Sequence, residues 1–494
     1  MQHATLGALL GASLLLASQT PVLAETTPDS SASLPYVRKN ASTPAALPDL
    51  MALQSALDKM RAMGCADPRS WYYQGATHAI PPTIPNGDNP LCPSYTNISQ
   101  LKWGWNTCTH QDGSEIHFLL WHRLYIQHFE SIVRQLSGKR DFALPYWDYT
   151  NTAYRVMPEP LRKPGSSLFT AERLPSLNAG QPIQNTPRAD MNKLLDVTSL
   201  FQNRVFSAFS NQIDRAPHGA MHNYIGGVAN DLTMWNSIYR DNAHSGLMGE
   251  VPSAGFDPVF WLHHANIDYL WQKWERSPNG RRPSLAELQA VPWPYQFFDA
   301  NGQRVQYSVE QAYRAAFSPD YVYDQLGSPV AALDSNDGKQ LLQAHARQQA
   351  QQLWQTRPRQ AMQGQSLDLA PPAEAATKQP ELMANADTAL VLQMVVSFSA
   401  EPDNAYEVLI TDSQGGEQLA GYLTFFGAAH HASGHGGAEH AHGEHAAAPA
   451  RLQASFLFDV TDELPADGQF GLRVKSQGSQ GEDLRIEEIS LSRF

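Results

Sequence analysis

The stretch FDPVFWLHHANIDYLWQKW, residues Phe256–Trp274, predicts a helix with an apolar stripe and two adjacent histidines, each of which is either a metal ligand or a hydrogen-bonded core residue. Asp257 is suited to the N-cap, and Pro258 suits the first helical position because it needs no amide hydrogen there. The adjacent His263 and His264 project about 100° apart on a helix. We therefore do not expect both imidazoles to point straight into one site.

Asp268 lies four residues after His264 and so shares its helix face. It can hold an imidazole in place by a hydrogen bond, or it can pair with a neighbouring cation. The sequence leaves both alternatives open.

A second histidine pair stands in APHGAMH, where His218 and His222 are four residues apart. Four residues turn a helix by only about 40° beyond a full turn, so both rings lie on one face. A zinc protease would need a glutamate directly after the first histidine. Gly219 stands there instead, which weakens the zinc-hydrolase interpretation.

The stretch CTHQDGSEIHFLLWHRLY, residues 108–125, offers three more histidines. A helix over 116–136 directs His122 to the core within an apolar face, whereas His117 points about 140° away. One helix can thus give the site one ligand, and further ligands must come from other segments. The candidate ligands in these other segments are His78 and His110.

The apolar periodicity predicts a mainly α domain over residues 35–327, with long loops around a four-helix bundle. The expected helices cover 50–63, with Asp49 as a plausible cap, and 116–136, with a third beginning at Asp257 and a fourth near 201–209. Residues 328–387 are rich in Gln, Ala and Pro and are predicted to be a linker with partial helix. Strand-like runs separated by turns over 388–494 predict a small β sandwich.

The chain has 494 residues and a formal net charge of −13, which disfavours nucleic acid or an anionic membrane surface as the main partner. Residues 1–24 read as a signal peptide cleaved after Ala24, so we expect export to the periplasm or medium. No later segment has about 18 uninterrupted apolar residues, so we expect no membrane-spanning segment in the mature protein. The sequence predicts no particular oligomeric state.

Three cysteines occur in the chain, and an exported protein can pair two of them. We expect a disulfide between Cys65 and Cys92, which both lie in loop-like sequence, and this leaves Cys108 over. A separate histidine-rich stretch, His430–His445, is expected to be a loop within the β domain. It either is solvated or collects metal weakly.

Several motifs together resemble the type 3 copper proteins, which are the tyrosinases, catechol oxidases and haemocyanins. They are WYYQGATH, WHRLY, PYWDY, PHGAMH and FDPVFWLHHANIDYLW, and the resemblance spans about Tyr36–Tyr323. It implies two copper ions, each held by three imidazoles. Neutral imidazole suits copper. The implied ligands are His78, His110 and His122 for copper A, and His218, His222 and His264 for copper B, with His263 beside them.

The resemblance also assigns roles to other residues. A thioether is implied between Cys108 and His110, although twelve residues separate His110 from His122, more than is usual in the family. If the thioether is absent, His117 competes with His110. Asp214 matches a glutamate that positions a basic water in plant relatives, with a surface ion pair as the alternative.

The family often has an asparagine after the first copper B histidine, where it assists monophenol deprotonation. This chain has Gly219 there, and Asn223 follows the second histidine. The implied activity is oxidation of phenols by dioxygen, as hydroxylation of monophenols or oxidation of o-diphenols to quinones. An o-aminophenol oxidase and a haemocyanin-like dioxygen carrier are the alternatives.

The β domain resembles the C-terminal domain of plant polyphenol oxidases, in its position and in the stretch LAGYLTFFG. That domain can shield the copper site until it is displaced. The resemblance implies the hypothesis that residues 388–494 do the same, and the sequence leaves open whether they shield the site or are removed.

Overall fold

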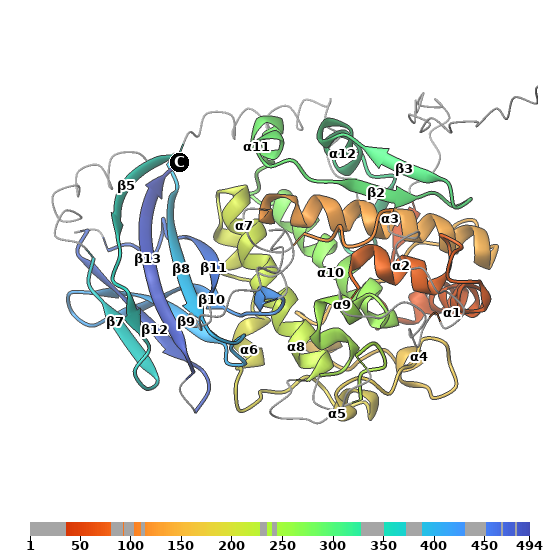
Figure 1. Ribbon diagram of the computed structural model, residues 1–494, viewed down its shortest axis with the longest axis horizontal. Helices are drawn as coiled ribbons and strands as arrows, with labels where there is room; N and C mark the ends of the chain where they lie inside the picture. The colour runs from red at the N-terminus through yellow and green to blue at the C-terminus, as the bar shows by residue number, and fades with distance from the viewer. Residues whose placement is uncertain are drawn as a thin grey trace, which may run out of the picture.

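The computed structural model describes residues 36–80, 92, 103–109, 114–227, 235–239, 245–327, 350–371, 388–429, 451–465, 468–479 and 482–494. A helical core is followed by C-terminal β sheets, and the two parts lie side by side (Figure 1). The core is built around α1 (Leu47–Ala62), α2 (Trp71–His78), α3 (Phe118–Ser137), α7 (Phe206–Ile213), α8 (Ala220–Gly226) and α10 (Pro258–Glu275). Shorter helices surround them: α4 (Glu159–Arg162), α5 (Pro175–Asn178), α6 (Met191–Leu194), α9 (Val251–Ala254), α11 (Leu285–Ala290) and α12 (Val309–Ala316).

The four predicted helices all form, as α1, α3, α7 and α10. α3 packs against both α1 and α10, and every residue from Phe118 to Ile126 is buried, so this half of the helix is covered on all sides. The Asp257 side chain caps α10 by accepting a hydrogen bond from the Val259 amide at 2.8 Å. A helical core with C-terminal β sheets is thus confirmed, whereas a mainly α fold is a stronger statement than the sheet content supports.

Asp49 does not cap α1, which is a correction to the sequence prediction. The helix begins at Leu47, two residues before Asp49, and Asp49 lies buried in its first turn. Its carboxylate accepts from Lys39 at 2.6 Å and from Lys139 at 2.8 Å. Two lysines therefore balance the negative charge of Asp49, which was predicted to cap the helix.

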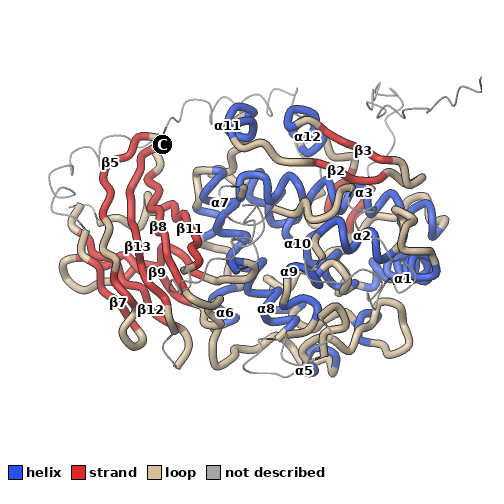
Figure 2. The backbone as a smooth tube through the Cα atoms, viewed as in Figure 1, coloured by secondary structure: helices blue, strands red, loops and turns tan. Residues whose placement is uncertain are grey.

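The C-terminal part is a sandwich of two antiparallel sheets, which share one apolar core (Figure 2). One sheet has the order β10–β9–β12–β7 and the other the order β11–β8–β13–β5, with β6 also on β13. All six predicted strand runs form strands: β8 (Leu390–Phe398), β9 (Tyr406–Asp412), β10 (Glu417–Leu423), β11 (Leu452–Asp459), β12 (Phe470–Ser476) and β13 (Leu484–Arg493).

The predicted linker 328–387 needs a correction, because part of it belongs to the sandwich. It contains β5 (Gln351–Thr356), β6 (Gln360–Ala361) and β7 (Ser366–Leu369). These strands add to the edges formed by β13 and β12. Their glutamines face solvent while Leu353, Trp354 and Leu369 are buried, so the polar composition concealed strands with one apolar face.

Four further strands belong to the helical part. β1 (Tyr36–Arg38) pairs in parallel with β4 (Tyr321–Tyr323), which brings both ends of this part together. β2 (Tyr295–Phe298) and β3 (Arg304–Tyr307) form a hairpin against α3. These strands close the helical part around its core.

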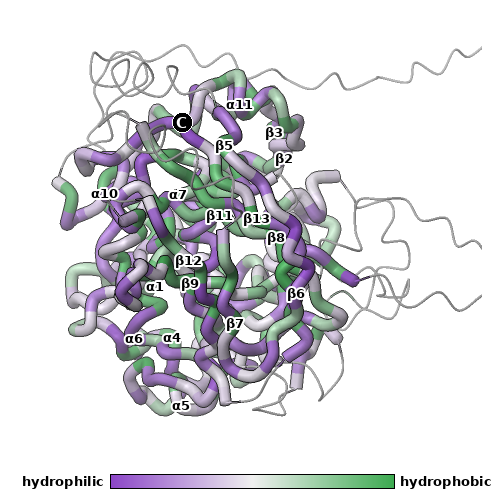
Figure 3. Tube along the Cα trace, turned by 90° about the vertical axis from the view of Figure 1, so that its left-hand side faces the viewer, coloured by the Kyte–Doolittle hydropathy of each residue, from purple (hydrophilic) through white to green (hydrophobic). Residues whose placement is uncertain are grey.

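The sandwich packs on the helical part mainly through β11 and α7, which lie next to each other in Figure 1; Figure 3 shows the molecule from the sandwich side. Asn211 of α7 accepts from the Leu457 amide at 3.0 Å, and the Gln212 side chain donates to the Leu457 carbonyl at 2.7 Å. An apolar contact between Val205, Ala208, Ala389 and Val391 lies beside these bonds. The two parts are therefore held together by specific polar pairs as well as by apolar burial.

Some predictions fall outside the described residues, namely the signal peptide 1–24 and the histidine-rich stretch His430–His445. Among the helices of the described ranges, none combines the length and apolarity that crossing a membrane requires.

Candidate metal centre

Histidines from separate elements meet at one buried point of the helical part. His78 is the last residue of α2, His122 lies in α3 and His264 lies in α10. His222 lies on α8, and His218 lies in the kinked segment Asp214–Gly219 that leads into α8. All five are at most 3% exposed.

The histidines form two groups that share His264. One group is His78, His122 and His264, and the other is His218, His222, His263 and His264; within each group the potential ligand atoms lie within 4.8 Å of one another. The His218 and His222 ring centroids are 4.5 Å apart, and those of His122 and His264 are 4.1 Å apart in parallel planes. Two adjacent metal positions can be served by this set.

Backbone carbonyls orient the imidazoles. His78 Nδ1 lies 3.1 Å from the Val251 carbonyl, and His222 Nδ1 lies 2.8 Å from the Met248 carbonyl. His122 Nδ1 makes the same contact with its own helix at Phe118, at 2.8 Å. A carbonyl can only accept, so each Nδ1 carries the hydrogen and each Nε2 offers its lone pair to a metal.

α2 can bring His78 close because glycines line its contact with the α9 segment. A Cβ built on Gly75 would lie 2.6 Å from the Phe256 ring, and one on Gly255 would lie 3.0 Å from the Gly75 carbonyl. Larger residues would push α2, and with it His78, away from Val251.

His264 fits a metal ligand by its surroundings. Neither of its ring nitrogens has a hydrogen-bond partner among the described residues. Burial, followed by the neighbouring histidines, lowers its pKa well below the ordinary value, so the ring is neutral. A buried neutral imidazole without a hydrogen bond is explained by a bound metal ion.

His263 lies closer to the site than the helix geometry predicted. Its Nδ1 is 2.8 Å from the Tyr149 hydroxyl, and its ring stacks on His218 at 5.1 Å. It thus belongs to the same group of rings as the expected copper B ligands, although it is adjacent in sequence to His264.

The two residues with predicted catalytic roles lie in different places. Asp214 is buried, and its Oδ1 lies 3.0 Å from His218 Nδ1. Asn223 is half-buried and lines a cavity between the helical part and the sandwich. Asp214 therefore contacts a histidine of the site, whereas Asn223 faces another space.

Asp268 does not orient a histidine in this structure, which corrects one of the two alternatives. It accepts from Arg123 Nε at 2.5 Å and from Arg38 at 3.0 Å, and the Tyr321 and Tyr323 hydroxyls also donate to it. Burial alone would raise the pKa of Asp268, but the two guanidinium groups lower it below its usual value. Asp268 therefore pairs with neighbouring cations, which is the second of the two predicted alternatives.

The cysteines take separate positions. Cys65 and Cys92 form a disulfide with a Cα–Cα distance of 5.7 Å. Cys108 is buried with its Sγ 3.3 Å from His122 Nε2, and burial raises the pKa of its thiol. Its expected thioether partner, His110, lies outside the described residues.

His117 lies away from the cluster. Its Nδ1 is 2.7 Å from the Tyr295 hydroxyl, and its Nε2 contacts the Val291 carbonyl. Burial lowers its pKa. Both ring nitrogens are occupied, so His117 is not placed to replace His110.

Phe426 is the site residue that sequence reasoning missed. It follows β10 in the sandwich, and its ring stacks on His222 with centroids 4.0 Å apart and planes 14° apart. Its signal is the stretch LAGYLTFFG, which resembles part of the plant C-terminal domain but does not by itself point to one residue. Phe118 and Phe260 line the same point from α3 and α10, each within 5 Å of two histidine rings.

Comparison with known proteins matches the common central domain of tyrosinase to residues 68–188 and 158–277. A tyrosinase from Hahella sp. is 30% identical over 274 residues, which are 52% of this chain and 56% of that protein. Aureusidin synthase from Antirrhinum majus is 26% identical over 52% of this chain and 46% of its own length. The chain thus spans about half the length of these relatives.

The fold has a counterpart among solved structures. A latent aurone synthase, a polyphenol oxidase, superposes with a TM-score of 0.62 at 15% identity, and the match covers 97% of this chain and 92% of that one. The similarity therefore includes the C-terminal sheets as well as the helical part. The region that matches the common central domain of tyrosinase contains His78, His122, His218, His222 and His264, the five buried histidines that meet at the candidate metal centre.

Proposed function

We propose that this protein oxidises phenols with dioxygen at a binuclear copper centre. The observation that carries the proposal is the convergence of histidines from α2, α3, α8 and α10 on one buried point. The similarity to a tyrosinase and to an aureusidin synthase supports the same reaction class. Phenols and dioxygen are then the substrates.

The ligand sets follow from the positions of the histidines. We infer that His78 and His122 hold copper A together with His110, and that His218, His222 and His264 hold copper B. Neutral imidazoles suit copper in both oxidation states. When bound, the two copper ions supply the electron transfer by which two o-diphenols are oxidised and one dioxygen is reduced to water.

The protein fixes the ligands and excludes water. The carbonyls of Val251 and Met248 hold the His78 and His222 rings in one tautomer, so no proton needs to move when copper binds. Phe118 and Phe260 pack against these rings and keep the site apolar, which favours a flat aromatic substrate over water.

We infer that Asp214 positions His218. The His218 Nδ1 lies 3.0 Å from the Asp214 carboxylate and 3.1 Å from the Asp214 backbone carbonyl, so both acceptors orient the ring and leave its other nitrogen to a metal. This role differs from the water-positioning role that the family resemblance implied. Asn223 has no such contact, and we assign it no part in the chemistry.

We further propose that the intact chain is shielded. Phe426 is 3% exposed and covers His222, where a substrate ring would have to approach copper B. Thr424 anchors the same loop by donating to the Arg215 carbonyl at 2.7 Å. The sandwich has to shift, or be removed, before a phenol can enter.

Gly219 provides the room for Phe426. A Cβ at Gly219 would lie 3.2 Å from the Phe426 Cβ and 3.3 Å from Thr424 Oγ1, closer than side chains normally approach. The glycine that stands after the first copper B histidine therefore suits a shielded site.

The test is to load the purified full-length protein with copper and to measure metal content and turnover of catechol and of a monophenol. We expect two copper ions per chain and oxidation of catechol. Fewer than two copper ions, or no turnover of either phenol even after the sandwich is released by proteolysis, would contradict the proposal. The N-terminal sequence supports export, which detection of the processed protein outside the cytoplasm would test.

A further inference from the structure

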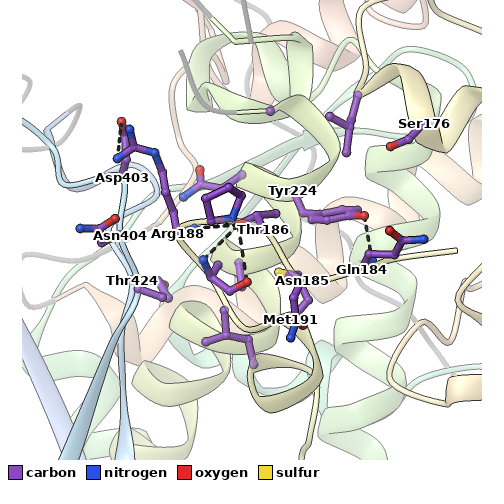
Figure 4. A pocket seen from close by; sticks show the side chains of 18 of the residues that line it. Ser176, Gln184, Asn185, Thr186, Arg188, Met191, Tyr224, Asp403, Asn404 and Thr424 are labelled. Carbon is purple, nitrogen blue, oxygen red and sulfur yellow. Dashed lines mark hydrogen bonds and ion pairs between the residues drawn. The ribbon is translucent and has the colours of Figure 1, made fainter. Parts of the chain in front are cut away.

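A cavity of about 470 Å³ lies between the helical part and the sandwich (Figure 4). Its helical wall includes Leu174, Met191 and Tyr224, and its sandwich wall includes Asn404, Thr424 and Phe425. This volume is within the range of pockets that hold small organic molecules. The cavity is separate from the histidine cluster, although Phe425 directly precedes Phe426.

The walls favour an uncharged ligand. Arg188 reaches the cavity, but its guanidinium lies 3.6 Å from Asp403 and 3.6 Å from Glu482, so its charge is already balanced. Leucine, methionine, proline and aromatic side chains make up much of the remaining lining. An anion or cation would lose its hydration here without gaining a free counter-charge.

Tyr224 supplies a polar contact. Its hydroxyl accepts from the Gln184 amide at 2.9 Å, which leaves its own hydrogen to be donated to a ligand (Figure 4). Burial raises the pKa of this hydroxyl, so it stays protonated at neutral pH. A carbonyl, ether or hydroxyl oxygen on an apolar molecule is the matching group.

We propose that this cavity binds an uncharged, mainly apolar small molecule with one hydrogen-bond acceptor, and that the bound molecule keeps Phe426 over His222. The site exists only while the helical part and the sandwich are packed together, because each supplies one wall. A ligand that contacts both walls binds the packed form alone and stabilises it by mass action. The second half of the proposal rests on the proposed shielding.

Ala220 and Asn223 of α8 also line the cavity, on either side of His222 in sequence. The cavity and the shielded face of the copper site therefore share both a helix and the loop Thr424–Phe426. A ligand in the cavity restrains both elements at once.

The test uses the uncharged aromatic alcohol 2-naphthalenemethanol as the probe, titrated into the full-length copper-loaded protein and followed by its fluorescence. We expect one probe per chain. Gln184→Trp places a large ring at the cavity wall and should weaken binding about tenfold or more. Gln181→Trp is the matched control, since Gln181 is an exposed glutamine of the same loop that does not line the cavity, and it should bind normally.

Tyr224→Phe gives a second, milder variant, because it removes the hydrogen-bond donor and leaves the ring. It should weaken binding several-fold. Amide hydrogen exchange of Thr424–Phe426 should slow when the probe is bound. The proposal is overturned if no probe binds, if Gln184→Trp and Gln181→Trp bind equally, or if exchange in this loop is unchanged.

Binding and turnover are separate readouts. A protein that binds the probe and never oxidises catechol contradicts only the proposed function. A protein that oxidises catechol and binds no probe contradicts only the cavity proposal.

Discussion

The Phe426 ring stacks on the His222 ring with centroids 4.0 Å apart, and the proposed shielding makes access to the copper centre depend on this side chain. Phe426→Gly should therefore raise catechol turnover by the full-length protein about tenfold or more, because the substrate ring no longer competes with a tethered one. Phe426→Leu retains a bulky group and should stay slow. Copper content serves as the control and should be two in all three proteins; equal turnover by wild type and Phe426→Gly would refute shielding by this residue.

Gly219 should act on the same contact. Gly219→Ala places a methyl group against Phe426 and Thr424, so it should loosen the loop and raise turnover. In the Phe426→Gly background the same substitution should have little further effect, because the Phe426 side chain that it would displace is absent. Additive effects on kcat/KM in the double variant would show that Gly219 acts elsewhere.

The histidines give a prediction about metal content. His222→Gln removes a ligand that a carbonyl holds in place, and it should lower bound copper from two ions to about one per chain. His117→Gln is the matched control, since this buried histidine binds Tyr295 and Val291 instead, and it should leave copper content unchanged. Elemental analysis of the dialysed proteins measures both; a loss of copper in His117→Gln would return that residue to the site.

At the scale of elements, Asp268 joins four segments of the helical part. From α10 it reaches Arg123 of α3, Arg38 of β1 and the Tyr321 and Tyr323 hydroxyls of β4. Asp268→Asn leaves two buried guanidinium groups with less counter-charge and should lower the free energy of unfolding by about 3–5 kcal/mol. Denaturant unfolding measures the change.

The control is Asp462→Asn, which breaks an exposed pair with Arg204 and should cost about 1 kcal/mol or less. The pH dependence has a definite sign. The pKa of Asp268 is lower in the folded protein than in the unfolded chain, so its stabilisation is present above the unfolded value of about 3.9 and is lost as pH falls through the folded value. If Asp268→Asn and Asp462→Asn lower the free energy of unfolding equally, the buried network contributes no more to stability than the exposed ion pair.

The helices could be predicted because their apolar stripes and caps are local, as Asp257 before α10 illustrates. The destination of Asp268 could not be predicted, because its partners Arg38 and Tyr321 are distant in the chain and meet only through the pairing of β1 and β4. The same holds for His263, whose partner Tyr149 is 114 residues away. β5 and β6 could not be predicted because their glutamines face solvent, which gives these strands the composition of a linker. The same holds for β7, where only Leu369 of the four residues is buried.

At the scale of the whole molecule, the sandwich meets the helical part beside His222, so under the proposed shielding the stability of their contact sets how often the site is open. Lys193–Glu407 and Arg204–Asp462 cross this contact near the surface. Gln212 and Asn211 cross it with less exposure to solvent. Exposed ion pairs weaken with salt while buried amide pairs do not, so salt alone should open the site only partly.

Glu401 gives a prediction about the pH dependence of this contact. It belongs to the sandwich, and its Oε2 accepts from the Ala429 amide at 3.0 Å, just beyond the loop that carries Phe426. Burial raises the pKa of Glu401 to about 8, and the charges of Glu250 in the helical part and of Asp403 add to this shift. The ordinary value is 4.5, so between these two values the shielded form keeps a proton that an open, hydrated form gives up.

Raising the pH from 6 to 9 should therefore favour the open form and increase the turnover of the full-length protein. Glu401→Gln cannot ionise and should lose this rise, whereas Phe426→Gly, which is already open, reports how pH affects the chemistry itself. Dividing the wild-type rate by the Phe426→Gly rate at each pH isolates the opening step. The Glu401→Gln rate is divided by the Phe426→Gly rate in the same way. If both ratios rise equally with pH, the proton that controls opening belongs to another group. If both ratios are flat, the contact between the two parts does not respond to pH.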